Sequence, residues 1–259
     1  MIFLFVIILG AIVGSALTAL LSRLAGGQSW LRGRSRCVHC ERVLGVRELI
    51  PVVSWLIQRG VCHGCRRPIG WSYPAIELLT GILFVFGFAL RFGADPLPQL
   101  LGDPARFLLL ALRDFYAIAV LLVIFIFDLT RGLILDRVTL PAIAILSVLS
   151  LLLGVTPLNL ILGIAIGAGF FLTQYLLSSG RWIGGGDIRL GALMGALLGW
   201  QSLLVALFVA YVTGGITAGV LLARRQKTWQ SAMPFGTFLS ASALFALYFG
   251  EAVIKWYVG

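Results

Sequence analysis

The sequence predicts an all-α polytopic membrane protein with about eight transmembrane helices and a small polar segment between the first two. Three observations lead to this fold class. Of the 259 residues, 60% are hydrophobic, and the mean hydropathy of +1.03 exceeds what a soluble domain needs. Apolar runs recur near the length of about 20 residues that crosses a bilayer. All four cysteines lie in the one long polar interval.

Each apolar run predicts one transmembrane helix, and the polar interval divides the chain into three parts. These are a first transmembrane helix at 1–22, a four-cysteine domain at 23–72 and a transmembrane domain at 73–259. The run from Ile2 to Leu21 lacks the basic start and cleavage site of a signal peptide, so we expect it to be retained. The expected spans are roughly 2–22, 73–90, 110–128, 138–154, 157–177, 187–200, 202–222 and 235–254.

The net charge of +10 would indicate nucleic-acid binding in a soluble protein, but the placement of the charge indicates membrane topology instead. We therefore expect the lipid bilayer, and no nucleic acid, as a partner. Sixteen of the 20 Lys and Arg residues fall on one side of the predicted spans. They are Arg23, Arg32, Arg34, Arg36, Arg42, Arg47, Arg59, Arg66, Arg67, Arg131, Arg137, Arg181, Arg189, Arg224, Arg225 and Lys227. The positive-inside rule makes this side cytoplasmic, so both termini should face away from the cytoplasm.

The cysteines form two Cys-x-x-Cys pairs within the polar interval. The pairs are Cys37/Cys40 and Cys62/Cys65, separated by 21 residues. This spacing is typical of a four-thiolate zinc site, and in so small a segment the metal would replace a hydrophobic core. We expect a structural zinc ion, because four thiolates leave no open position for substrate. Two disulfides are the alternative, but these require an oxidising compartment. His39 and His63 lie inside the pairs and could replace a cysteine as ligand, but we expect them to be solvent-facing spacers.

Two aspartates lie where apolar helices should carry no charge. Asp128 lies within the run Val123–Leu129, and Asp187 opens the apolar stretch after Gly184, Gly185 and Gly186. A charge in hydrocarbon costs at least about 2.5 kcal/mol on insertion scales, so such residues usually serve a function. If they meet, the pair can share a proton and activate water. The charge asymmetry places both carboxylates at the cytoplasmic ends of their helices.

Both aspartates also have simpler interpretations. Asp128 could pair with Arg131 one turn later, at a helix end that Gly132 breaks. Asp187 could be the N-cap that ends a glycine linker. Against this, three successive glycines allow positive φ angles and leave space beside the backbone, so the stretch is a candidate for binding an extended substrate. A phosphate-binding loop is not favoured, because no P-loop Lys-Ser/Thr follows and Asp187 would repel phosphate.

Two further acidic residues and one small-residue run stand out. Glu77, early in the second span, could pair with Arg66 or Arg67 or line the same cavity as the aspartates. Glu48 could be a solvated surface residue. The run Gly191–Ala196 is typical of closely packed membrane helices.

Taken together, these motifs resemble those of the type IV prepilin peptidases, also called prepilin leader peptidase/N-methyltransferases. The resemblance covers nearly the whole chain. Three departures are Leu135, where a proline is usual, Arg189, where a lysine is usual, and the stretch 16–27, which lacks the usual Phe-Leu-Asn and terminal proline. The matching motifs are Gly14-Ser15, both cysteine pairs, Glu48–Leu56, Arg59-Gly60, Arg67–Ile69, Tyr73-Pro74, Glu77–Gly81, the Asp128 segment, Gly184–Asp187 and Pro234–Gly236.

The resemblance implies a membrane aspartic endopeptidase of the Gly-x-Gly-Asp kind, with Asp128 and Asp187 as its catalytic residues. Its substrates would be prepilins and pseudopilins of type IV pilus and type II secretion systems, cut at the cytoplasmic face after the glycine that ends a basic leader. Many members then methylate the new N-terminus with S-adenosylmethionine, and the four-cysteine domain is associated with that bifunctional form.

Two functions of other classes remain open from the residues alone. A proton- or cation-coupled transporter could use Asp128 and Asp187 as a relay, although it predicts internally repeated halves that the sequence lacks. A zinc-dependent scaffold that assembles other membrane proteins would have no chemistry and would tolerate loss of both aspartates.

Overall fold

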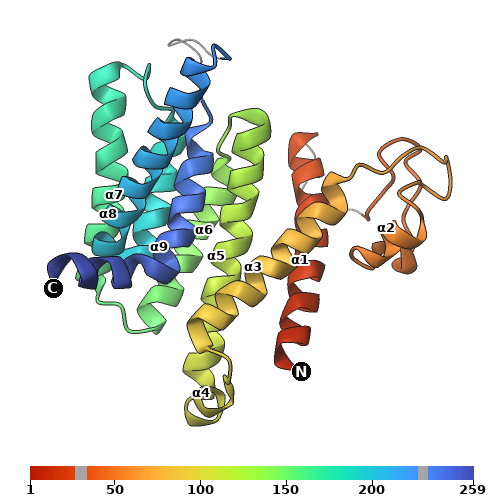
Figure 1. The fold of residues 1–259 in the computed structure, drawn as a ribbon, viewed down its shortest axis with the longest axis horizontal. Coiled ribbons are helices and arrows are strands. Elements are labelled where there is room, and N and C mark those ends of the chain that lie inside the picture. Colours follow the sequence, from red (N-terminus) through yellow and green to blue (C-terminus); the bar gives the residue numbers. More distant parts are fainter. Residues whose placement is uncertain (27–33, 227–232) are drawn as a thin grey trace. The chain divides into compact units, whose positions relative to one another are not determined.

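The structure is a computed structural model that describes residues 1–26, 34–226 and 233–259. Two of the basic residues used above, Arg32 and Lys227, lie outside these ranges. The chain divides into two compact units, Met1–Ala94 and Asp95–Gly259, and each is treated by itself. The helices of the first unit are α1 (Ile2–Ala25), η1 (Val46–Leu49), α2 (Val53–Ile57) and α3 (Ser72–Phe92). Those of the second are α4 (Leu97–Gly102), α5 (Pro104–Arg131), α6 (Asp136–Leu152), α7 (Pro157–Ser178), α8 (Gly185–Ala223) and α9 (Phe235–Val258) (Figure 1).

The predicted all-α membrane fold is confirmed. Within the described ranges, six helices are long and apolar enough to cross a membrane: α1, α3, α5, α7, α8 and α9. The predicted number of eight separate spans is not confirmed. The span expected at 138–154 falls on α6, which has 17 residues, and the spans expected at 187–200 and 202–222 are both part of the 39-residue helix α8.

Glycines allow the two membrane helices of the first unit to pack closely (Figure 1). A Cβ atom added to Gly10 would lie 2.8 Å from the Cα of Gly81, and one added to Gly14 would lie 2.7 Å from the Cα of Glu77. Because only glycine permits such a close approach of two backbones, these positions fix how α1 lies against α3.

A second glycine contact joins α7 to the first part of α8. Gly163 and Gly167 on α7 face Gly195 and Gly191 on α8, and an added Cβ at any of the four would lie within 2.5 Å of a backbone oxygen. The small-residue run noted in the sequence therefore makes the close helix contact that was predicted for it.

Helix α8 reverses its direction at Gly199, which has φ of 70° and ψ of 174°. Before this residue, α8 runs along α7, where Gly191 lies beside Gly167. After it, α8 runs back along α9: Ser202 lies beside Gly250, in the last part of α9, and Gly214 lies beside Phe235, at its start. The Asn159 side chain accepts a hydrogen bond from the Trp200 N–H at 3.2 Å, which stabilises the reversal. Both Asp187 and Gly214 consequently lie at the end of the bundle where α9 begins.

Replacing Gly167 by alanine is expected to destabilise the protein by about 2 kcal/mol, in the range for overpacking a tight contact. The new methyl would lie 2.1 Å from the Gly191 oxygen, a backbone atom that has little freedom to move. Gly169→Ala, on the same helix but with nothing within 4 Å, should leave stability unchanged or slightly raised. Thermal unfolding of both variants in detergent checks the difference, and equal melting temperatures would contradict the contact.

Candidate active site and metal-binding group

Asp128 is held at the C-terminal end of α5 by the start of α9. The side chain is 4% exposed, and its Oδ2 accepts a hydrogen bond of 2.8 Å from the backbone N–H of Thr237. Gly236 makes the approach possible, because an added Cβ there would lie 2.9 Å from the same oxygen. Within the described chain, Asp128 forms no ion pair with Arg131, so the helix-end salt bridge considered from the sequence is not what holds it. Gly132 ends α5 as predicted, with φ of 64°.

Asp187 lies in the first turn of α8 and is 8% exposed. Its Oδ2 accepts a hydrogen bond of 3.1 Å from the Gly184 N–H, so the carboxylate caps the helix from its third position instead of serving as the N-cap itself. Gly184 is the N-cap, in an extended conformation with φ of −80°.

None of the three glycines takes the positive φ that glycine allows, and Gly185 and Gly186 already belong to the first turn of α8. Their small size matters instead. An added Cβ on Gly186 would lie 2.8 Å from the Ile134 Cβ, whereas one on Gly185 would meet only the Arg189 side chain, at 3.4 Å. Gly186 therefore admits a neighbouring segment, and Gly185 leaves space beside the backbone near Asp187.

Ile134, in the segment between α5 and α6, connects the surroundings of the two carboxylates. It touches Gly186, next to Asp187, and its Cδ1 lies 2.9 Å from a Cβ position on Gly236, which also borders Asp128. The two carboxylates are near enough to interact electrostatically. The structure thus brings both aspartates to one end of the helix bundle, although they are 59 residues apart in sequence.

Neighbouring side chains fix the helix ends that carry the site. Arg189, one turn into α8, forms an ion pair with Asp136 at the start of α6 and donates a hydrogen bond to the Gly185 oxygen at 3.2 Å. On the other side, the Tyr211 hydroxyl bonds Gln174 at 2.9 Å, and the Tyr211 ring packs on Phe235 with centroids 4.9 Å apart.

Such an arrangement suits acid–base chemistry. Backbone N–H groups orient both carboxylates: Asp128 accepts from Thr237, and Asp187 accepts from Gly184. Two interacting carboxylates can hold one proton between them, so one can accept a proton while the other donates one.

The four cysteines of the first unit come together as one metal-binding group. Their sulfur atoms all lie within 4.8 Å of one another, and none is in a disulfide, so the disulfide alternative is not found. The two pairs have the same local structure. An isolated antiparallel β-bridge joins Arg36 to Val43 around the first pair, and another joins Val61 to Pro68 around the second.

The group fits a tetrahedral ion. The Cys37 and Cys65 sulfurs are 3.9 Å apart, close to the roughly 3.8 Å edge expected for Zn–S bonds of about 2.3 Å. Backbone N–H groups of Cys65 and Gly64 lower the pKa of the Cys62 thiol to about 6, which favours its thiolate, whereas burial and hydrogen bonds with the other three thiols raise the pKa of Cys40. His39 and His63 are not members of the group, as expected.

Glu48 and Glu77 both have backbone partners in the first unit. The Gly45 N–H and Arg42 hold the pKa of Glu48 below its usual range. Glu77 is 8% exposed, and its carboxylate accepts a hydrogen bond of 2.7 Å from the Val52 N–H. The predicted pairing of Glu77 with Arg66 or Arg67 is not found among the described residues, because the backbone of another loop satisfies this carboxylate.

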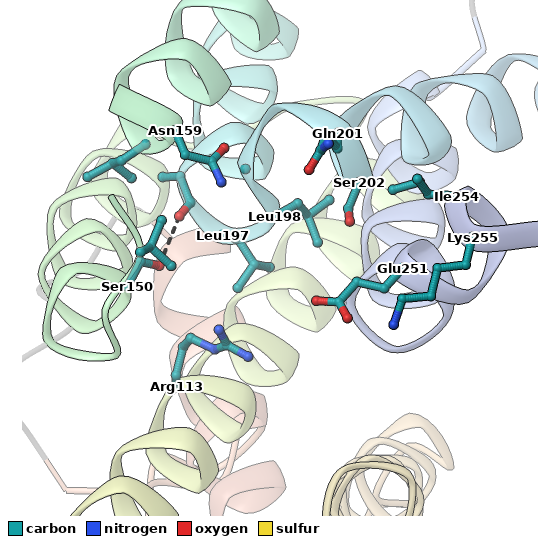
Figure 2. Close-up of a pocket in the computed structure, with 14 residues that line it drawn as sticks. Arg113, Ser150, Asn159, Leu197, Leu198, Gln201, Ser202, Glu251, Ile254 and Lys255 are labelled. Atoms are coloured by element: carbon teal, nitrogen blue, oxygen red, sulfur yellow. Dashed lines mark hydrogen bonds between the residues drawn. The ribbon is translucent and has the colours of Figure 1, made fainter. Parts of the chain in front are cut away.

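A polar cavity of about 370 Å³ lies at the other end of the second unit, around the reversal of α8 (Figure 2). In Figure 2 the side chains of Arg113 and Glu251 point towards one another across it, and Ser150 bonds the Ala196 oxygen at 3.1 Å. The cavity contains neither Asp128 nor Asp187. This cavity is therefore separate from the candidate active site, and its Arg113 is paired with the buried Asp114 at 2.9 Å.

The sequence did not point to three parts of the site: the Thr237 N–H, Ile134 and Tyr211. Gly236 had been noted only as part of the resemblance. A backbone donor carries no signature in its residue type, and Ile134 resembles any apolar residue of a membrane protein. The one usable signal was the glycine after Pro234, since a helix start does not by itself require a small residue.

Two family models match the chain. The Bacterial Peptidase A24 N-terminal domain matches residues 8–91, and the Type IV leader peptidase family matches residues 115–219. The second match includes both aspartates, and the first includes all four cysteines. Nothing in the comparisons supports a transporter.

Curated relatives are similar over most of the chain, and each carries the name prepilin leader peptidase/N-methyltransferase. A protein of Aeromonas hydrophila is 32% identical over 87% of this chain and 74% of its own length. A protein of Legionella pneumophila is 31% identical over 87% of this chain and 76% of its own length. A protein of Bacillus subtilis is 31% identical over 97% of this chain and 96% of its own length. No solved structure matches.

Proposed function

Because the chain belongs to the type IV leader peptidase family, we propose that it is a membrane aspartic endopeptidase that removes the basic leader of prepilins and pseudopilins after a glycine. The observation that carries the proposal is the placement of two buried carboxylates, Asp128 and Asp187, around Ile134 at one end of the bundle. Each comes from a different helix, and a backbone N–H orients one oxygen of each.

In the proposed reaction, the charged aspartate removes a proton from water as the water attacks the scissile carbonyl. The protonated aspartate donates a hydrogen bond to the carbonyl oxygen, and a proton then passes to the leaving amine. The products are a free leader ending in glycine and a pilin with a new N-terminal amine. The Thr237 and Gly184 N–H groups hold the two carboxylates in fixed orientations, ready for water and substrate.

The glycines before Asp187 are proposed to bind the substrate backbone. Gly184 and Gly185 leave space beside the chain, and an extended segment there would lie next to the carboxylate. Gly186 is required for the contact with Ile134, so its contribution is to the shape of the site.

The proposed orientation puts the active site at the cytoplasmic face of the inner membrane. The unequal distribution of Lys and Arg supports this, since the basic side carries the helix ends with Asp128 and Asp187. The basic leader would remain in the cytoplasm, and the apolar stalk of the substrate would remain in the bilayer.

Two cofactors are part of the proposal. Zinc held by Cys37, Cys40, Cys62 and Cys65 would stabilise the segment at 23–72, the proposed domain between the helix at 1–22 and the peptidase domain at 73–259. S-adenosylmethionine would supply the methyl group for the new N-terminus, on the strength of the names of the relatives. No residue of this chain is assigned to that cofactor.

Cleavage of a prepilin in membranes that contain this protein tests the proposal. We expect a product shortened by the leader, with the new N-terminus identified by mass spectrometry directly after the glycine. A matched prepilin with a leucine in place of that glycine should stay intact. If several prepilins remain uncut while proteoliposomes take up protons, the peptidase proposal fails and the transporter replaces it.

Gly236→Ala is expected to lower the cleavage rate by about 10- to 100-fold with the fold retained, because small misplacements of a catalytic group have effects of this size. The added methyl would lie 2.9 Å from both the Asp128 Oδ2 and the Ile134 Cδ1, so the carboxylate must move. Gly215→Ala, with nothing within 4 Å, is the matched control and should cleave like the wild type. Equal rates for the two variants, measured by product formation at saturating prepilin, would show that Asp128 does not depend on this contact.

A further inference from the structure

The polar segment of the first unit presents a row of exposed aliphatic side chains. Val53, Leu56 and Ile57 share one face of α2, with exposed fractions of 47%, 60% and 73%. Leu49 and Ile50, directly before this helix, are 40% and 46% exposed. We call these five residues the α2 apolar face. So many neighbouring large apolar side chains on a small segment mark an interaction surface.

A hydrogen bond fixes the position of this face along the axis of the membrane helix α3. The Glu77 carboxylate, five residues into α3, accepts the Val52 N–H at 2.7 Å. At a rise of 1.5 Å per residue, Glu77 lies only about 7 Å from the helix start, and helical side chains lean towards the N-terminus. Val52 therefore lies level with the first turns of α3.

These first turns lie at the membrane boundary. With 21 residues, α3 is just long enough for a hydrocarbon core of about 30 Å, so its first turn cannot lie far inside or outside. Trp71, immediately before the helix, is 69% exposed, and tryptophan is enriched at this depth. Trp55 of α2 packs against Trp71 with ring centroids 4.9 Å apart, which holds α2 at the same level.

The backbone at Val52 is strained in a way that serves this placement. Val52 has φ of 61° and ψ of −51°, and the Val53 N–H donates to the Pro51 oxygen at 2.5 Å, which together form a classic γ-turn. A positive φ is rare for a β-branched residue, and such strain persists only where surrounding contacts enforce it. The turn directs the Val52 N–H to Glu77 and starts α2 in the next residue.

We propose that the α2 apolar face inserts into the headgroup region of the bilayer, with Glu77 as the positioning residue that sets its depth. The occupant of the face is anionic phospholipid. Four exposed arginines, Arg47, Arg59, Arg66 and Arg67, lie in or next to these loops and provide the complementary charge. The zinc-binding segment is thereby held against the membrane surface from which α3 begins. This inference needs only a membrane and is independent of the proposed peptidase activity.

Photocrosslinking of the full chain in nanodiscs that contain phosphatidylglycerol tests the proposal. p-Benzoylphenylalanine is introduced at Ile57, on the α2 apolar face, or at Val38 as the matched control. Val38 is an aliphatic residue of the same segment with a similar exposed fraction, 67%, but it lies between Cys37 and Cys40. Mass spectrometry should find several-fold more lipid adducts at position 57 than at 38. Equal yields, or adducts at 57 with protein instead of lipid, would overturn the proposal.

Variants of Glu77 test whether its hydrogen bond to Val52 sets the depth of the α2 apolar face, or whether the apolar side chains alone are enough. In Glu77→Gln the amide oxygen still accepts the Val52 N–H, so the adduct yield at position 57 should stay at the wild-type level. In Glu77→Ala the bond is lost, and the yield should fall several-fold while the backbone N–H of Val52 exchanges faster with deuterium. An alanine variant with unchanged lipid adducts would contradict the role of Glu77, and if that variant does not fold, the comparison of positions 57 and 38 decides.

Discussion

Asn in place of Asp128 or Asp187 is expected to abolish prepilin cleavage, lowering the rate by at least about 10³-fold, within the range for loss of a catalytic acid or base. An asparagine has nearly the same shape as an aspartate, and its oxygen can still accept the Thr237 or Gly184 N–H. It cannot accept a proton from water or donate one to the substrate as a carboxyl group does. Loss of activity with retained folding therefore reports on the chemistry, and product formation from a prepilin in membranes measures it.

Asp103→Asn is the matched control for these substitutions. Asp103 is the N-cap of α5, where its carboxylate accepts the Arg106 N–H at 3.0 Å, and asparagine caps helices about as well as aspartate. The same chemical change on the same helix should therefore leave cleavage unaffected. An active Asp187→Asn or Asp128→Asn variant would remove the acid–base pair from the account, whatever the control does.

Removal of zinc is expected to unfold the polar segment while the membrane helices stay folded. Binding of structural zinc contributes about 10–16 kcal/mol in small zinc-finger peptides, as much as the whole stability of a typical domain. The cysteine-bearing loops have few buried side chains besides Cys62 and Gln58, so little else maintains their structure. Cys62→Ser should lose the metal and become cleavable by a protease between residues 34 and 72.

His63→Ala provides the matched comparison, because His63 lies in the same Cys-x-x-Cys pair but outside the sulfur cluster. It should keep one zinc per chain, measured by elemental analysis, and should resist the protease. Loss of zinc from His63→Ala with retention in Cys62→Ser would show that the ligands have been assigned wrongly.

Hydropathy was sufficient to predict the class of the fold, and local signals predicted several helix ends. Gly132 ends α5 and Pro234 precedes α9, as each residue type favours. The reversal of α8 was harder, because Gly199 is one glycine among many in an apolar stretch. Its conformation depends on the Asn159 side chain, 40 residues earlier, and on contacts with α7 and α9 that only the folded chain contains.

The candidate site was predictable where charge conflicts with its surroundings. Asp128 and Asp187 stand out because an ionised group in an apolar helix is unfavourable unless it has a task. The cysteine spacing predicted the sulfur cluster for a comparable reason, since thiolates in paired positions match a metal. The contacts that orient the aspartates were not predictable, because the Thr237 N–H is a backbone group from a helix 109 residues away in sequence.

The glycines before Asp187 show the limit of reasoning from residue type. Glycine permits positive φ but does not require it, and Gly185 and Gly186 are used for their small size inside a helical turn. What decides between these uses is the neighbour, Ile134, whose position against Gly186 follows from the path of the segment between α5 and α6.

The most direct test of the central claim, that the two carboxylates act as one pair, compares cleavage rates of the wild type, Asp128→Asn, Asp187→Asn and the double variant on one prepilin. Residues that act as a unit are strongly non-additive, so the double variant should be no slower than either single variant. All three should give the same residual rate in the same membranes. If each single variant retains partial activity and the losses multiply in the double variant, Asp128 and Asp187 act independently and the paired mechanism is contradicted.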